Sequence, residues 1–255
     1  MPLALAEKRA AFRALHASGC FVLPNPWDIG GVRRLEKLGF QALASTSAGI
    51  AWSLGRVDNE LSRDTVLDHL RTLCASTDLP INADFEDGFA STPDGVAANV
   101  KLAVATGVAG LSIEDRDGKG LYTRAIAVER IRTAKAAIAA SGGDVMLVAR
   151  SEGFLLGQPD LDATIARLTA YAEAGADVLY APGITDPDAI ARIVRAVAPK
   201  PVNVLLFSPQ MRVADLAAIG VRRVSTGGAL AAAAWRGFDL AAKQLFDTGT
   251  LPPRG

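Results

Sequence analysis

Residues 81–87 read INADFED, a short apolar strand that runs into three acidic residues. Side chains alternate across a strand, so Asp84 and Glu86 share one face while Phe85 shares the other with Asp87. Residues 110–115 read GLSIED, and the same alternation adds Glu114 to the acidic face. Glu114 is therefore expected to join Asp84 and Glu86 where these two strands end.

The same rhythm extends over the whole chain, because short apolar runs alternate eight times with longer segments of helical periodicity. Several helical segments end in glycine just before the next strand, a common helix stop: Gly39, Gly107, Gly175 and Gly220. Eight units predict a single (β/α)₈ TIM barrel over residues 1–255, with an open doubly wound sheet as the alternative. The strand candidates are FVLPN near residue 21, ALAST near 42, INADFED near 81, GLSIED near 110, VMLVAR near 145, VLYAPG near 178, VNVLLF near 202 and RVSTGG near 222.

Residues 3–18 predict an extra helix at the bottom of the barrel.

The composition restricts the possible partners of the protein. Half of the 255 residues are apolar and the formal net charge is zero, which argues against nucleic acid and anionic membranes and favours a small molecule. The longest uncharged stretch, residues 39–55, is interrupted by polar side chains and does not resemble a membrane span. Cys20 and Cys74 form no CxxC pair and no secretory leader is evident, which together predict a cytoplasmic protein.

Barrel enzymes place their chemistry at the carboxyl ends of the strands. Asp84, Glu86 and Glu114 are expected there, and the fifth strand ends in Arg150. Several carboxylates at one mouth are costly unless they are protonated, paired with arginine or neutralised by a cation. A metal ion is therefore favoured.

The expected ligands are all oxygen atoms, since the two histidines, His16 and His69, fall in helical segments. Oxygen ligands favour Mg²⁺ or Mn²⁺ over zinc. The alternative is that the acids are solvated or form ion pairs with Arg116, Arg124 and Arg150.

Two further segments lie at predicted strand ends. The hydroxyls and backbone N–H groups of Ser45, Thr46 and Ser47 suit a substrate carboxylate, although a simple polar turn has the same composition. Residues 225–229, STGGA, open a helix where an anion could bind, or they allow close helix packing.

These segments, in this order and spacing, resemble the isocitrate lyase and phosphoenolpyruvate (PEP) mutase superfamily from about Leu23 to about Leu245. The stretches that carry the resemblance are PNPWD at 24–28, TSAGIA at 46–51, LGRVD at 54–58, NADFEDG at 82–88, GLSIED at 110–115, ARSE at 149–152 and RVSTG at 223–227.

The resemblance implies that Asp84 binds Mg²⁺ directly while three other carboxylates hold its water shell, namely Asp58, Glu86 and Glu114. It also implies that Arg150 stabilises an enolate oxygen. The loop of Ser45, Thr46 and Ser47 would bind a substrate carboxylate, and Asn203 would contact the substrate. It further implies a homotetramer or homodimer in which the eighth helix is exchanged between subunits.

The chain departs from the superfamily's lyases in the gating loop, which carries a cysteine in those enzymes. Here residues 116–122 read RDGKGLY, without cysteine, so isocitrate or methylisocitrate cleavage is disfavoured. Lys119 is the candidate gate residue, or else a solvated loop charge. Glu86 stands where an aspartate is usual and Ala44 where the mutases have an aromatic residue, which indicates a short branch of the superfamily.

The leading hypothesis is a Mg²⁺-dependent enzyme that acts on a small 2-oxo (di)carboxylic acid, as a C–C lyase or decarboxylase with an enolate intermediate and with Arg150, Glu114 and Lys119 as catalytic residues. The alternatives are P–C bond chemistry of the PEP mutase or phosphonopyruvate type and a 2-oxo acid binding protein that has lost catalysis. A Schiff-base aldolase is disfavoured because no lysine falls at the end of the sixth strand.

Overall fold

Eight parallel strands form one sheet in the computed structural model, which describes residues 3–253. Their order is β1-β10-β9-β8-β7-β4-β3-β2, and the backbone N–H of Ala44 donates to the carbonyl of Pro24 (3.0 Å), which links the two outermost strands. The sheet is thus a nearly closed barrel: the TIM-barrel prediction is confirmed and the open sheet is excluded. The strands are β1 (Phe21–Leu23), β2 (Leu43–Ala44), β3 (Ile81–Asp84), β4 (Gly110–Glu114), β7 (Met146–Arg150), β8 (Val178–Tyr180), β9 (Val202–Leu205) and β10 (Arg223–Ser225).

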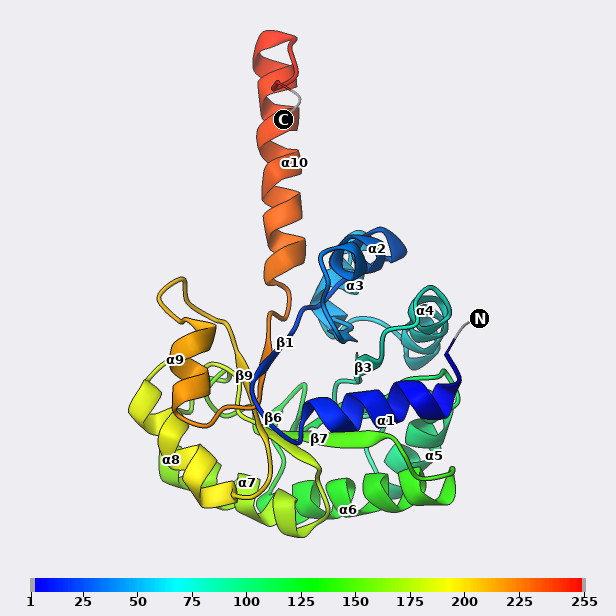
Figure 1. Cartoon of the computed structure of the whole chain (residues 1–255), viewed down its shortest axis with the longest axis vertical. Coiled ribbons are helices and arrows are strands. Elements are labelled where there is room, and N and C mark those ends of the chain that lie inside the picture. Colours follow the sequence, from blue (N-terminus) through cyan, green and yellow to red (C-terminus); the bar gives the residue numbers. More distant parts are fainter. Residues whose placement is uncertain (1–2, 254–255) are drawn as a thin grey trace.

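Helices follow the strands around the outside, and one helix projects away from the barrel (Figure 1). That helix is α10, which begins at Ala229 and ends at Thr248. The others are α1 (Leu5–Leu15), α2 (Ile29–Lys37), α3 (Ser47–Ser53), α4 (Arg63–Ala75), α5 (Pro93–Val104), α6 (Arg124–Ala140), α7 (Leu161–Glu173), α8 (Pro187–Val197) and α9 (Val213–Ala218). Between residues 3 and 253 no helix is both long enough and apolar enough to cross a membrane.

Local sequence explains where these helices begin and end. The side chains of Thr92 and Asp160 accept the N–H of the residue three positions on, at the starts of α5 and α7. The predicted glycine stops are confirmed, since all four have positive φ: 89° at Gly39, 97° at Gly107, 105° at Gly175 and 92° at Gly220. Each glycine turns the chain back toward the next strand.

The extra helix predicted over residues 3–18 is α1, and it crosses one end of the barrel (Figure 1). Its Phe12 is fully buried against residues that point into the barrel, including Leu23 and Val148. A Cβ at Gly110 would lie 2.8 Å from the Phe12 ring, so only glycine fits there. Because Phe12 fills this end, the barrel interior is accessible from the carboxyl ends of the strands.

The acidic stretch differs in one respect from its prediction. Strand β3 ends at Asp84, and Glu86 lies in the following turn with a positive φ of 45°. Phe85 is buried in the outer core, as the alternation predicts, while Asp87 pairs with Arg130 and also lines the hollow that contains Glu86. The segment after β4 forms a hairpin of β5 (Arg116–Asp117) and β6 (Gly120–Leu121).

Candidate active site

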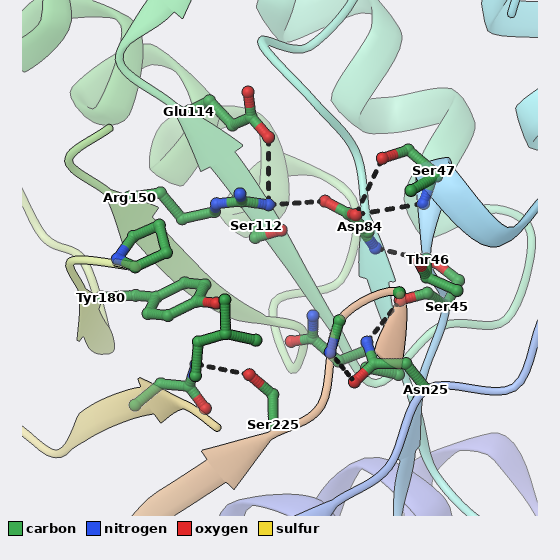
Figure 2. Close-up of a pocket in the computed structure, with 18 of the residues that line it drawn as sticks. Asn25, Ser45, Thr46, Ser47, Asp84, Ser112, Glu114, Arg150, Tyr180 and Ser225 are labelled. Carbon is green, nitrogen blue, oxygen red and sulfur yellow. Dashed lines mark hydrogen bonds and ion pairs between the residues drawn. The ribbon is translucent and has the colours of Figure 1, made fainter. Parts of the chain in front are cut away.

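A polar cavity of about 170 Å³ lies at the carboxyl ends of the strands, where barrel enzymes hold their active sites (Figure 2). Most residues predicted for the site line it: Ser45, Thr46, Ser47, Asp58, Asp84, Glu114, Arg150 and Asn203. Glu86 lies in an adjoining hollow that shares Asp58 and Glu114 with this cavity. Lys119 lines neither and is exposed at the turn of the β5–β6 hairpin.

Asp84 is held between the start of α3 and Arg150 (Figure 2). Its Oδ2 accepts the backbone N–H and the hydroxyl of Ser47, each at 3.1 Å, and its Oδ1 accepts Arg150 Nη1 at 2.8 Å. The hydroxyl of Ser45 accepts the backbone N–H of Asp84 at 2.8 Å. The serine loop therefore positions this carboxylate, a role that the residue types alone did not indicate.

Arg150 is the centre of the charge network. Its Nη1 lies 2.8 Å from Asp84 Oδ1 and 3.0 Å from Glu114 Oε1, and its Nε donates to Glu152 at 2.9 Å. The guanidinium also lies over the ring of Tyr180, 5.2 Å from the ring centroid. Although burial alone would lower the pKa of Arg150, the surrounding carboxylates hold it well above the usual value. Arg150 is therefore a fixed cation that faces the cavity.

The acidic wall is only partly neutralised. Burial, followed by the charges of Asp84, Glu114 and Asp58, raises the pKa of Glu86 to about 8. Its Oε1 is buried, and no residue among 3–253 donates a hydrogen bond to it. Burial likewise raises the pKa of Asp58. In its ionised form this unpartnered buried carboxylate, beside three others, would require a nearby positive charge.

The expected ion pairs are present in part. Arg116 Nε donates to Glu114 Oε2 at 3.0 Å and lies 4.0 Å from Glu152, and Arg150 pairs as described. Arg124 begins α6 and makes none of the ion pairs found within residues 3–253. Arginines thus neutralise Glu114, Asp84 and Glu152 while leaving Glu86 and Asp58 without a cationic partner in the described chain.

The cavity is also lined by two polar residues that sequence reasoning missed, Arg223 and Tyr180. Arg223 is 2% exposed, and its Nε donates to Asn203 Oδ1 at 2.8 Å. Asn203 Nδ2 donates to the hydroxyl of Ser225 at 3.0 Å, and Tyr180 lines the cavity above them. The only signal in the sequence for this polar lining was Arg223 within a strand segment. Because Arg223 is the first residue of β10, the sequence there is equally typical of a solvated strand end.

The two histidines and the two cysteines lie outside the cavity. His16 ends α1 and His69 lies within α4. Cys20 and Cys74 are unpaired thiols in partly buried positions, and burial raises the pKa of Cys74 to about 12. Among residues 3–253, those that line the cavity include neither histidine nor cysteine.

The family described as Phosphoenolpyruvate phosphomutase matches residues 12–246. The chain belongs to this family. A crystal structure described as a lyase/mutase from Burkholderia cenocepacia J2315 is 50% identical, with a TM-score of 0.94, and the match covers 97% of this chain and 91% of that one. The superfamily resemblance seen in the sequence is confirmed.

Relatives with stated activities include an oxaloacetate decarboxylase and a lyase. Oxaloacetate decarboxylase of Bradyrhizobium sp. (strain BTAi1) is 31% identical over 216 residues, which are 80% of this chain and 72% of that protein. 2-Methylisocitrate lyase of Escherichia coli (strain K12) is 35% identical over 162 residues, 59% of this chain and 53% of that protein. The chain is an enzyme of the superfamily that contains these lyases and the phosphonomutases.

Proposed function

We propose that this protein is a Mg²⁺-dependent enzyme that breaks a carbon–carbon bond next to a 2-oxo acid, as a lyase or decarboxylase, and that the reaction passes through an enolate. The observation that carries the proposal is the juxtaposition of Arg150 with an acidic wall that arginines only partly neutralise. Cleavage beside a 2-oxo group leaves negative charge on the oxo oxygen, and fixed positive charges stabilise it in a buried cavity.

The residues present fit a hard divalent cation. Glu86 Oε1 is a buried oxygen without a donor, and the hollow that it lines also contains Asp58 and Glu114. Mg²⁺ usually keeps several waters and binds through one or two carboxylates; within residues 3–253 no three Asp, Glu, His or Cys side chains are arranged as a direct ligand cluster. Asp84 would hold the ion directly, with Asp58, Glu86 and Glu114 on its waters, and Mn²⁺ fits the same oxygen donors. The ion, when bound, supplies positive charge to a developing enolate oxygen.

The remaining roles belong to the chain's own groups. Arg150 stabilises and orients the 2-oxo oxygen, and Glu114 holds Arg150 in place from the other side. Ser45, Thr46 and Ser47 receive the substrate carboxylate near the start of α3, and Asn203 contacts the substrate from β9. Lys119, exposed on the hairpin, closes over the bound substrate.

Oxaloacetate is the first substrate to test. The oxaloacetate decarboxylase of Bradyrhizobium covers most of this chain, whereas the methylisocitrate-type lyases carry a gating cysteine that residues 116–122 lack. The second candidate is P–C bond chemistry on phosphonopyruvate, which the matched family's description favours. Product analysis by NMR with Mg²⁺ and each acid distinguishes the two.

The decisive variant is Asp84→Asn, which keeps the side chain's shape and removes its charge. We expect turnover to fall by at least about 100-fold, in line with the loss of one transition-state charge contact. We also expect the rise in melting temperature (Tm) caused by MgCl₂ to disappear. Asp68→Asn, on the exposed surface of α4, is the matched control and should behave as the wild type.

Two outcomes would contradict the proposal. Full activity in Asp84→Asn would remove Asp84 from the cation site. Stabilisation of the wild type by oxaloacetate and by phosphonopyruvate, without any product from either by NMR, would instead indicate a 2-oxo acid binding protein.

A further inference from the structure

The proposed reaction requires a proton donor, and the inference below depends on that proposed function. Breaking the bond leaves an enolate whose carbon must be protonated before the product leaves. Among residues 3–253, those lining the cavity include no histidine, cysteine or lysine. The carboxyl groups are committed elsewhere, because Asp84, Glu114 and Glu152 pair with Arg150 and Asp58 faces the cation hollow.

Tyr180 is the phenol in the cavity lining, and its position suits a proton donor. It ends β8 directly beside Arg150 of β7 and Asn203 of β9 in the strand register. Its side chain is nearly buried, at 7% exposure, and its ring stacks beneath the Arg150 guanidinium (Figure 2). A group that contacts the enolate-stabilising arginine lies next to the atoms that react.

The phenol is protonated at neutral pH and lies near two groups that favour its anion. Burial raises the pKa of Tyr180 to about 12, while the charge of Arg150 and the Ser225 hydroxyl act in the opposite direction. These two neighbours stabilise the phenolate that would remain after the proton is given up.

Arg223 is otherwise difficult to explain. It is almost fully buried, and its hydrogen bonds go to two neutral amide oxygens, those of Asn203 at 2.8 Å and Asn82 at 3.4 Å. No carboxylate in the described chain lies within ion-pair distance of it. Burial lowers its pKa to about 9, and negative charge on Tyr180 is the main influence that raises it. Burying a cation without an anionic partner costs free energy. A phenolate that forms on Tyr180 during the reaction would be such a partner for Arg223.

We propose that Tyr180 is the acid that protonates the enolate carbon and that Arg223 is a positioning residue that stabilises the resulting phenolate. The electron pair of the enolate takes the proton from Tyr180 Oη, so a C–H bond forms as the O–H bond breaks. The negative charge moves from the enolate to the phenolate. Solvent then returns one proton to Tyr180, which balances the cycle without any other reactant.

The test is Tyr180→Phe, which removes one oxygen atom and keeps the ring that stacks on Arg150. Exchange of the methyl protons of pyruvate in D₂O with MgCl₂, followed by ¹H NMR, reports the same proton transfer in reverse. We expect at least a 100-fold slower exchange, as for loss of a general acid–base group. Oxalate resembles the enolate but accepts no proton at carbon, so its Mg²⁺-dependent Tm shift should be unchanged. Arg223→Gln should slow exchange less than Tyr180→Phe and also leave the oxalate shift unchanged.

Tyr171→Phe is the matched control, because its buried hydroxyl bonds Asp115 outside the cavity. It should lower Tm and keep the wild-type exchange rate, which separates chemistry from stability. Equal exchange in Tyr180→Phe and the wild type would overturn the role of Tyr180 alone. Cleavage of oxaloacetate by the wild type without any exchange of pyruvate protons would also overturn the role of Tyr180. In that case the enolate would leave the enzyme first and be protonated in solution. A wild type that neither cleaves nor exchanges would overturn the proposed function and this inference together.

Discussion

His16 shows how a single buried side chain couples folding to pH. Its ring packs edge-on against Phe12 and Phe21, and its Nδ1 lies 2.8 Å from the Phe12 carbonyl. Burial, aided by the charge of Arg223, lowers its pKa to about 3. The neutral ring is therefore the form that the fold accepts.

This depressed pKa predicts a loss of stability in acid. Between the unfolded value near 6.5 and the folded value near 3, the unfolded chain binds a proton that the folded chain does not. Stability is then full above about pH 6.5 and falls as the pH decreases toward 3. From pH 7.5 to 5 the wild type should lose about 2 kcal/mol more than His16→Gln in urea unfolding. An equal loss in both proteins would show that another group is responsible.

Some residues of the site could be predicted from the local sequence, whereas others depend on how the strands pair. Asp84, Glu114 and Arg150 could be predicted because strand alternation and strand ends are local properties of the sequence. Tyr180 and Arg223 could not, because their roles depend on the register between β8, β9 and β10, which places both beside Asn203 at the cavity. Likewise the turn at Glu86, with its positive φ, is not visible in a stretch that continues the strand pattern.

Among the elements, the β5–β6 hairpin is fixed to the barrel by Asp115. This carboxylate is 3% exposed and accepts the Glu152 N–H at 2.8 Å, the Tyr171 hydroxyl at 2.7 Å and Arg167 Nη1 at 3.1 Å. Arg167 Nη2 also donates to the carbonyl of Tyr122 at 2.8 Å, just after the hairpin. Both ends of the hairpin are therefore tied to one buried charge network, which lies outside the cavity.

Asp115→Asn should consequently destabilise the protein. The change leaves Arg167 without its carboxylate and places an NH₂ group among donors, and breaking a buried pair in this way costs about 3 kcal/mol or more. Urea unfolding measures the loss, and hydrogen exchange should show reduced protection from Arg116 to Leu121. Asp117→Asn, at the tip of the hairpin, is the control and should stay within about 0.5 kcal/mol of the wild type. Unchanged protection in Asp115→Asn would show that the hairpin is held by other contacts.

The order of elements was predictable because each glycine stop and each helix cap is a local signal, as at Gly107 and Thr92. The hairpin was not, since RDGKGLY carries the composition of an ordinary loop. Its two short strands pair through Arg116 and Leu121, and the sequence does not show that the buried Asp115 anchors them.

For the whole molecule, the unusual feature is α10, which stands away from the barrel (Figure 1). Of its residues only Ala231 is buried. Trp235 and Phe238 contact each other edge-on, and with Leu245 and Phe246 they follow the spacing of one helix face. Phe238 is 62% exposed and Phe246 91% exposed. An apolar helix face of this kind is typical of a contact between protein chains.

We therefore expect the protein to be a homodimer or homotetramer in which α10 packs against a neighbouring copy, as the family resemblance implies. The double variant Phe238→Asp, Phe246→Asp places two charges on this face, and burying them against another copy would cost several kcal/mol. Light scattering after size-exclusion chromatography should show an oligomer for the wild type and a smaller species for the variant. Asp239→Asn, on the same helix, is the control and should keep the wild-type mass. Because α10 follows β10 directly, and Arg223 and Ser225 of β10 form the cavity floor, loss of the oligomer should also reduce turnover. A monomeric wild type would contradict the exchange of α10, while leaving the assignment of the cavity intact.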